Sequence, residues 1–309
     1  MPAMLDNPSA NIKNDSTCRF ALLCTLFLLT AVWLEPHLGP LNRANAYIAG
    51  QILASAGFPA LVTGDLISVG NFPVQIVTEC TSLYAFLLLA SFMFASQAPW
   101  HEKIVGIIVG GAFLSAVNLL RIAGVTIVGV SRPVLFELVH VYLGQVLMVV
   151  LVVGCCLVWG NRNAISKTSC TGFVFRCLIW GVVLAILWLV MNVSYIKILD
   201  IVVARLFALA GYRLFIPYQH AVYYQTFNIV LFAALVLADQ KVSSRRRWLF
   251  GSAGLLALMG MHLLFRICNV MISAFAWHPA LPLSSLLSIF GQYLLPILIW
   301  NAIRQMPEE

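Results

Sequence analysis

Charged residues are scarce in this sequence. Only 9% of its 309 residues are charged, whereas 61% are hydrophobic and the mean hydropathy is +0.95. Because about a quarter of the residues of an average soluble domain are charged, this composition excludes a soluble globular protein. Apolar runs of membrane-spanning length recur along the whole chain, which indicates that the lipid bilayer is its solvent.

The basic residues do not indicate a nucleic-acid partner, although the formal net charge is +7. They lie in the short gaps between the apolar runs, where lysine and arginine orient a membrane protein. With the N-terminus inside, most of the 18 basic residues fall on the inner side. The positive-inside rule therefore predicts a multi-pass protein of the cytoplasmic (inner) membrane with both termini in the cytoplasm.

Cysteines at the spacing of a redox or metal-binding motif are also missing. The chain has eight cysteines but no CxxC pair and no regular metal-ligand spacing. We therefore expect no disulfide framework, no metal site and no cofactor. Cysteines within apolar helices usually act as small hydrophobic side chains, so a reactive one needs a specific argument. The eight are Cys18, Cys24, Cys80, Cys155, Cys156, Cys170, Cys177 and Cys268.

The apolar runs predict an all-α polytopic membrane protein with about eight transmembrane helices. The predicted ranges are 19–35, 80–98, 104–128, 139–159, 173–195, 221–239, 248–274 and 282–303. The first run follows a polar cytoplasmic leader, residues 1–18, and is similar to a signal peptide. Because the small-x-small cleavage pattern at Ala44-Asn45-Ala46 lies well past that run, we expect it to be retained as a helix.

The outer segment before the second helix contains two patterned stretches. From Asn42 to Ala56 apolar residues recur at helical spacing, which predicts an amphipathic helix on the outer face. Two β-prone runs then flank Gly70-Asn71 within Leu66–Val77, which predicts a short β-hairpin. Together they could form a substrate platform, or they could simply pack on the helix bundle.

The two halves of the chain resemble duplicated four-helix units. In the first half, Asn118–Ile122 lies in the third helix and Gly144-Gln145 in the fourth. In the second half, His262–Ile267 and Gly291-Gln292 hold the corresponding places. The C-terminal half is then either an inactive repeat or an accessory domain. The predicted domains are a catalytic core of four helices and this C-terminal half, residues 19–165 and 166–309.

Three polar motifs stand out at the outer ends of three consecutive predicted helices. Glu79-Cys80-Thr81-Ser82 opens the second helix, Asn118-x-x-Arg121 lies in the third, and His140 opens the fourth. Consecutive antiparallel helices with short connections are usually neighbours, so these residues could meet. They suit acyl transfer, in which a thiolate attacks a carbonyl, an imidazole moves protons and a guanidinium stabilises the oxyanion.

Each of these residues has a simpler explanation when it is taken alone. Cys80 could be an inert buried cysteine, although the N-terminus of a helix would lower its pKa. Arg121 could extend its guanidinium group to the outer surface of the membrane. An arginine within a span costs about 2.5–3.5 kcal/mol on insertion scales, however, and is normally kept for a function or an ion pair. His140 could be an ordinary interfacial histidine.

Taken together, these motifs resemble the exosortase/archaeosortase family of membrane-embedded cysteine transpeptidases. The resemblance rests on Glu79-Cys80-Thr81-Ser82, Asn118-x-x-Arg121-Ile122 and His140-x-x-x-Gly144 in this order, and it covers about residues 20–160. It implies cleavage of C-terminal sorting signals, each made of a short motif, a transmembrane helix and a basic tail, on membrane-anchored substrate proteins. It also implies that Cys80 is the nucleophile, Arg121 the oxyanion-stabilising or substrate-orienting cation, and His140 the acid/base.

The chain departs from the family pattern directly after the cysteine. The family often has Ser-Gly or Thr-Gly there, whereas this chain has Thr81-Ser82, so the oxyanion geometry or the substrate preference could differ. The expected supporting residues are Glu79, Ser82 and Asn118. Asn118 stands one turn before Arg121, where it could hydrogen-bond the guanidinium or the substrate, or serve helix packing.

We therefore expect a thiol protease or transpeptidase that acts at the outer face of the membrane, with an unknown acceptor nucleophile. The second half keeps Arg266 but has no counterpart of Cys80 or His140, and its Cys268 has no histidine at catalytic spacing. Two alternatives remain open. One is a non-enzymatic membrane component of polysaccharide or protein export, and the other is a parallel-repeat transporter that uses Arg121 and Arg266.

Overall fold

The structure is a computed structural model of the chain, and it describes residues 8–137, 139–140, 144–160, 167–216 and 225–305. The described chain is mostly helical and divides into two compact units. The first unit comprises Met1–Ser131 and Cys155–Asn163, and the second comprises Arg132–Gly154 and Ala164–Glu309. The predicted domain boundary after residue 165 stays a prediction.

Membrane-spanning helices are present in both units. Within the described residues, four helices are long and apolar enough to cross a membrane: Cys18–His37, Trp100–Ser131, Gly172–Leu209 and Ser244–Phe275. A bent pair, Ala280–Gln292 and Leu295–Gln305, is a fifth candidate whose two parts differ in direction by 48°. The prediction of a multi-pass helical membrane protein is therefore confirmed.

The prediction of eight spans is not confirmed. The apolar runs at 80–98, 139–159 and 221–239 contain shorter helices, which are α3 (Leu83–Ala95), α6 (Gly144–Gly160) and α9 (Asn228–Ala238). The 13 residues of α3 span about 20 Å at 1.5 Å per residue, which is less than the roughly 30 Å of a hydrocarbon layer. An apolar run thus gives the composition of a span but not the length of the helix within it.

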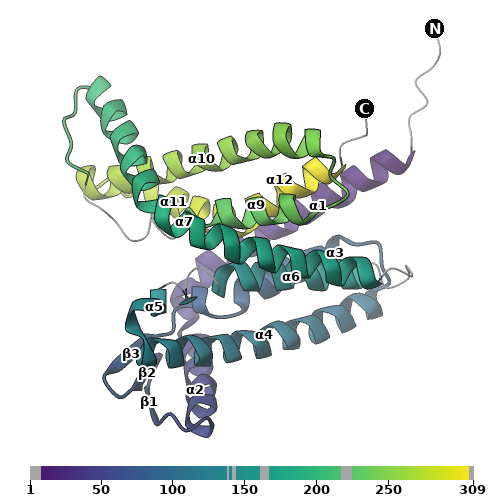
Figure 1. Cartoon of the computed structure of the whole chain (residues 1–309), viewed down its shortest axis with the longest axis vertical. Coiled ribbons are helices and arrows are strands. Elements are labelled where there is room, and N and C mark those ends of the chain that lie inside the picture. Colours follow the sequence, from purple (N-terminus) through teal and green to yellow (C-terminus); the bar gives the residue numbers. More distant parts are fainter. Residues whose placement is uncertain (1–7, 138, 141–143, 161–166, 217–224, 306–309) are drawn as a thin grey trace. The chain divides into compact units, whose positions relative to one another are not determined.

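The first unit is built around the long helix α4 (Trp100–Ser131). α1 (Pro8–Leu34) packs on α3, and α3 packs on α4 (Figure 1). After the 3-10 turn η1 (Glu35–His37), α2 (Gly39–Ser55) also packs on α4. α2 is the helix predicted at Asn42–Ala56, and its buried residues recur at the spacing of one helical face: Ala46, Ala49, Gly50 and Leu53.

The predicted hairpin is present and belongs to a three-stranded antiparallel sheet in the order β1-β2-β3. β2 (Leu66–Val69) and β3 (Phe72–Gln75) flank a two-residue turn in which Gly70 has φ +57°, a conformation that glycine adopts without steric cost. β1 (Ala60–Thr63) pairs with β2 through a second two-residue turn. β1 was not predicted from the sequence.

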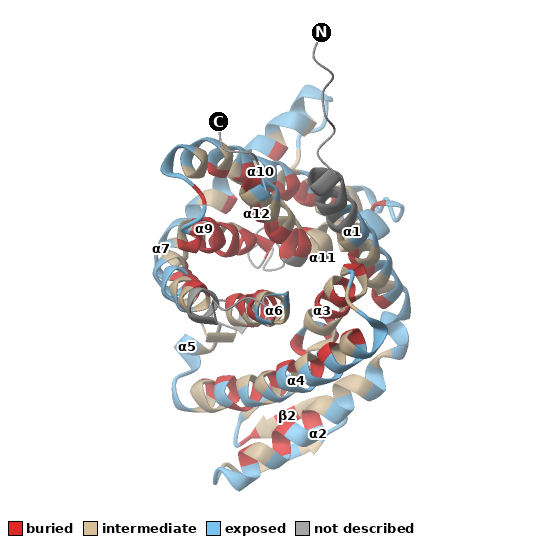
Figure 2. Ribbon diagram, turned by 90° about the vertical axis from the view of Figure 1, so that its right-hand side faces the viewer, coloured by how far each residue is buried: buried red, intermediate tan, exposed pale blue. Residues whose placement is uncertain are grey.

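The second unit contains α7 (Lys167–Leu209), α9, α10 (Ser244–Phe275) and a broken last helix. α9 is almost completely buried among its neighbours (Figure 2). The broken helix consists of α11 (Ala280–Ile289), a π-helical turn at Phe290–Leu294 and α12 (Leu295–Gln305). The short helix α5 (Pro133–Glu137) and the first part of α6 also belong to this unit.

A buried polar chain joins the helices of the second unit. The hydroxyl of Tyr195 lies 2.8 Å from Nδ1 of His262, and Nε2 of His262 lies 2.9 Å from Oδ1 of Asn228. Asn228 Nδ2 donates to the carbonyl of Gly291, so Oδ1 accepts from His262 and the imidazole in turn accepts from the tyrosine. Because every member is hydrogen-bonded, the chain fixes how α7, α9, α10 and the π-helical turn pack.

Local features recur between the two halves. Gly57 and Gly211 have φ angles of +86° and +88°, and each follows the end of a helix. The residue after each glycine donates a backbone hydrogen bond to the carbonyl five residues earlier. Phe58 N donates to Leu53 O and Tyr212 N to Phe207 O, both at 2.9 Å. α4 and α10 each have 32 residues. A duplication would produce these matches, and it stays a prediction.

Candidate functional site

Cys80 does not open a helix as predicted. It ends a 3-10 turn, η2 (Thr78–Cys80), and α3 begins only at Leu83. The turn is held by Cys80 N, which donates to Val77 O at 2.9 Å, and by the Thr81 hydroxyl, which donates to Thr78 O at 2.7 Å. Threonine and serine side chains that bond to nearby backbone compete with helix formation, which explains why the helix starts later than expected.

The surroundings of the Cys80 thiol favour its neutral form. The side chain is only 6% exposed, and burial raises the pKa of the Cys80 thiol above its ordinary value. The charge of Arg121 and a hydrogen bond with the Val77 backbone oppose this change, whereas the charge of Glu79 adds to it. The pKa-lowering effect expected from a helix N-terminus therefore does not prevail, and reaction at neutral pH needs a base that removes the proton.

Asn118 joins the cysteine turn to α4. Its side chain is fully buried, and its Nδ2 donates to the backbone carbonyl of Cys80 at 2.9 Å. Its Oδ1 accepts from Nη1 of Arg121 at 3.0 Å. These two contacts fix which end of the amide is oxygen and which is nitrogen. Of the roles considered for Asn118, hydrogen bonding to the guanidinium is thus present, and the same side chain also ties two segments together.

Ser82 and Glu79 have different environments. The hydroxyl of Ser82 lies 2.9 Å from that of Ser115, which stands one turn before Asn118 on the same face of α4. Glu79 is exposed and lies next to the buried Thr78. Ser115 was missed in the sequence analysis, although its spacing of three residues from Asn118 could have suggested it. α4 therefore contacts the segment Cys80–Ser82 through two polar side chains.

Thr78 connects the same turn to α2. Its hydroxyl accepts from Nδ2 of Asn42 at 3.4 Å, and its side chain is 3% exposed. Asn42 lies near the start of the amphipathic helix, so the helix that was considered as a substrate platform contacts the turn that carries Cys80. It also packs on α4, so the platform and packing interpretations are compatible.

His140 lies in the second unit, in a short π-helical segment that follows α5. Its ring stacks on Phe136, with 5.3 Å between the ring centroids and 5° between the planes. Residues 141–143, within the predicted His140-x-x-x-Gly144 motif, lie outside the described residues. The approach of His140 to Cys80 stays a prediction.

The intramembrane arginine of the second unit, Arg266, has an ionic partner within the same unit. Arg266 is 1% exposed and forms an ion pair with Asp200, with 2.6 Å between Nε and Oδ1. Asp200 was not predicted as the partner, because the two residues are 66 positions apart, on α7 and α10. An ion pair is a sufficient reason to keep an arginine within a bundle. Among the residues that the structure describes, no group of three or more histidine, cysteine or acidic side chains could hold a metal ion.

Residues 15–155 match a family model described as transmembrane exosortase (Exosortase_EpsH). The matched segment contains Cys80, Arg121 and His140, and it ends before the C-terminal half begins. The resemblance to the exosortases predicted from the sequence is therefore confirmed for this part of the chain. No curated protein and no solved structure matches the chain.

Proposed function

We propose that this chain, a transmembrane exosortase by the match of residues 15–155, is a cysteine protease/transpeptidase that cleaves C-terminal sorting signals of exported proteins. In this proposal Cys80 is the nucleophile, Arg121 stabilises the oxyanion and His140 is the acid/base. Glu79, Ser82 and Asn118 support them. The substrates are membrane-anchored proteins, and the reaction takes place at the outer face of the inner membrane.

The observation that carries this proposal is the bridge formed by Asn118. One amide group contacts both the Cys80 backbone and the Arg121 guanidinium, at 2.9 and 3.0 Å. A buried, doubly bonded asparagine holds its two partners in fixed positions, which is what a site needs when a cation must stabilise charge near a nucleophile. An arginine that merely extends to the membrane surface would not need this contact.

The proposed reaction has two halves. In the first, His140 takes the thiol proton and the Cys80 sulfur attacks the scissile carbonyl carbon, while Arg121 stabilises the oxygen that becomes negative. The carbon–nitrogen bond then breaks, the leaving amine takes the proton from His140, and a thioester remains on Cys80. In the second, water or an amine gives a proton to His140 and attacks the thioester. The proton returns to the sulfur as the carbon–sulfur bond breaks.

The proposal can be tested by co-expression with an epitope-tagged host protein that ends in an apolar helix and a basic tail. The wild-type chain should remove the tail, and Cys80→Ala should not, at equal abundance in the membrane. Cys268→Ala is the matched control, because Cys268 is similarly buried, at 7% exposed, in a segment that the family model does not match. Tail removal by the Cys80→Ala protein would overturn the proposal.

A further inference from the structure

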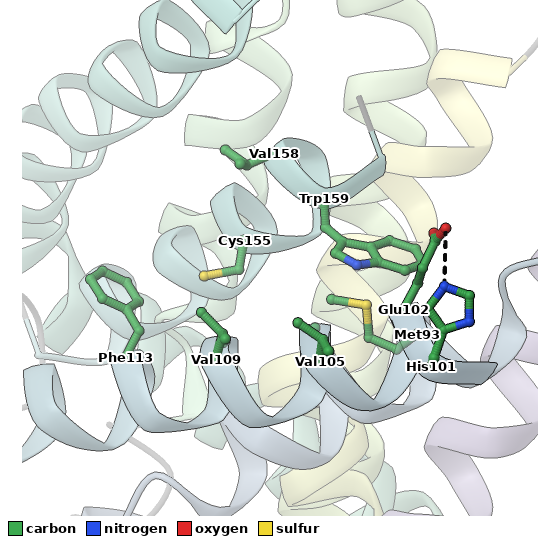
Figure 3. A pocket seen from close by; sticks show the side chains of 11 residues that line it. Met93, His101, Glu102, Val105, Val109, Phe113, Cys155, Val158 and Trp159 are labelled. Carbon is green, nitrogen blue, oxygen red and sulfur yellow. Dashed lines mark ion pairs between the residues drawn. The ribbon is translucent and has the colours of Figure 1, made fainter. Parts of the chain in front are cut away.

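An apolar groove of about 740 Å³ runs along α4 within the first unit (Figure 3). One wall consists of α4 side chains at successive turns, Val105, Val109 and Phe113, and the other consists of residues from the last turns of α6, Cys155, Val158 and Trp159. Figure 3 shows the two rows of side chains facing each other across the groove. Two parallel rows with a gap between them are the surface into which a further helix packs.

Two titratable side chains lie at one end of the groove. His101 and Glu102 line it there, with 3.8 Å between His101 Nε2 and Glu102 Oε1, and the Glu102 side chain is 35% exposed. The Lys103 ammonium donates to the carbonyl of Phe94 at 3.2 Å, near the end of α3, and lies over the Trp100 ring. The groove therefore combines apolar walls with a carboxylate at one end.

The groove lies on the helix that carries the candidate site. Asn118 and Arg121 follow Phe113 on α4, towards the other end of the helix. The rise from Glu102 to Arg121 is about 28 Å at 1.5 Å per residue, which is close to the roughly 30 Å thickness of the hydrocarbon layer. A transmembrane helix that lies along α4 with one end at Cys80 would thus have its other end at Glu102.

We propose that this groove binds the transmembrane helix of the protein substrate and that Glu102 binds a lysine or arginine directly after that helix. The inference rests on the proposed function, which puts the cleaved bond at the outer end of such a helix. The positive-inside rule gives a membrane helix basic residues at its inner end, where the predicted topology places Glu102. Close packing of apolar side chains then positions the helix, and the ion pair sets how deep it lies.

Photo-crosslinking tests the groove with two matched pairs of positions on α4. Val109 lines the groove and Ile108 does not, and both are 63% exposed. Val105, at 58%, and Ile104, at 51%, form a second such pair. A photoreactive phenylalanine at each position is introduced into the full-length Cys80→Ala chain, together with a tagged host protein whose tail the wild-type chain removes.

We expect crosslinks to the helix of the tagged protein from positions 105 and 109, and at most a tenth as many from 104 and 108. Equal crosslinking from all four positions, or adducts with lipid alone from position 109, would overturn the inference. If the wild-type chain still removes the tail in the same experiment, the proposed function is unaffected by that result. If the wild-type chain removes the tail of no such protein, it is the proposed function that fails.

The role of Glu102 is tested by exchanging charges. Glu102→Lys should raise the KM for the tagged substrate and leave kcat and the alkylation rate of Cys80 unchanged. Glu102→Gln should have a smaller effect on the same constant, of roughly three- to fivefold, as for a partly exposed ion pair. Replacing the first basic residue of the substrate tail with glutamate should restore the KM of the Glu102→Lys variant. Without this restoration Glu102 does not bind the tail.

Discussion

The amide nitrogen of Asn118 donates to the backbone carbonyl of Cys80 at 2.9 Å, from a side chain that is completely buried. The carbonyl belongs to a 3-10 turn rather than to a helix, so the turn depends on a partner outside its own segment. The same asparagine accepts from Arg121. The positions of Cys80 and Arg121 are thereby coupled through one residue.

Asn118→Ala should lower the rate of tail removal by about tenfold or more, because it removes the hydrogen bonds that Asn118 forms with the buried Cys80 carbonyl and with Arg121, at a cost of about 1–3 kcal/mol. Thr126→Val is the matched control on the same helix, since Thr126 is equally buried but bonds only to the carbonyl of Ile122 in its own helix. Initial rates measured at equal protein abundance check this. Equal rates for the two variants would show that the Asn118 bridge does not matter for the reaction.

Arg121→Lys should lose about 100-fold in kcat, the usual effect of removing one oxyanion donor. Lysine keeps the charge but loses the planar set of donors, which contacts Asn118 and in the proposed reaction also a substrate oxygen. Rate measurements over a range of substrate concentrations separate kcat from KM. If Arg121 only extended to the membrane surface, lysine would serve as well and both constants would stay unchanged.

The alkylation of Cys80 should depend on pH in a way that follows its raised pKa. Only the thiolate reacts, so the rate with iodoacetamide should rise with pH, with a midpoint above that of an ordinary cysteine. Arg121→Gln removes a charge that lowers this pKa and should move the midpoint up, whereas Glu79→Gln removes a charge that raises it and should move it down. Mass spectrometry of the labelled peptide gives the rates. A midpoint below the ordinary value would contradict the structure.

The ion pair between Asp200 and Arg266 should matter for stability and not for the chemistry. Asp200→Asn leaves a buried arginine without its counter-charge, which typically costs 3–5 kcal/mol, so the Tm in detergent and the abundance should fall. The double variant Asp200→Leu/Arg266→Met should recover most of both, since apolar residues of similar size remove the uncompensated charge. A specific loss of tail removal in this double variant, at normal Tm, would instead give the second unit a role in the reaction.

The sequence predicted those features that depend on local pattern. The length of the apolar runs predicted the long spans, and the helical spacing of apolar residues predicted α2. The Gly70-Asn71 pair predicted the β2–β3 turn. The predicted start of α3 was wrong because the hydroxyl of Thr81 donates to the backbone carbonyl of Thr78, and a hydropathy pattern does not reveal such a contact. The pairing of Asp200 with Arg266 joins residues distant in the sequence, and no periodic pattern encodes it.

The site shows the same division between local and distant information. Residue type and order marked Cys80, Asn118 and Arg121, because polar groups are rare within spans. The Asn118 contact to a backbone carbonyl could not be predicted, since it depends on the 3-10 turn and not on a side-chain motif. The expected lowering of the Cys80 pKa was wrong mainly because burial raises the pKa of this thiol, and the position assumed to be a helix N-terminus is a 3-10 turn.

The central claim, that Cys80 forms a covalent thioester with the substrate, is tested most directly by trapping that species. The tagged substrate is labelled on the part that precedes the cleaved bond, the reaction is quenched in acid, and the modified peptide is located by mass spectrometry. The account predicts label on Cys80 that hydroxylamine releases, no label in Cys80→Ala, and strongly reduced label in His140→Ala. Label on any other residue, or tail removal by the Cys80→Ala protein, would contradict it.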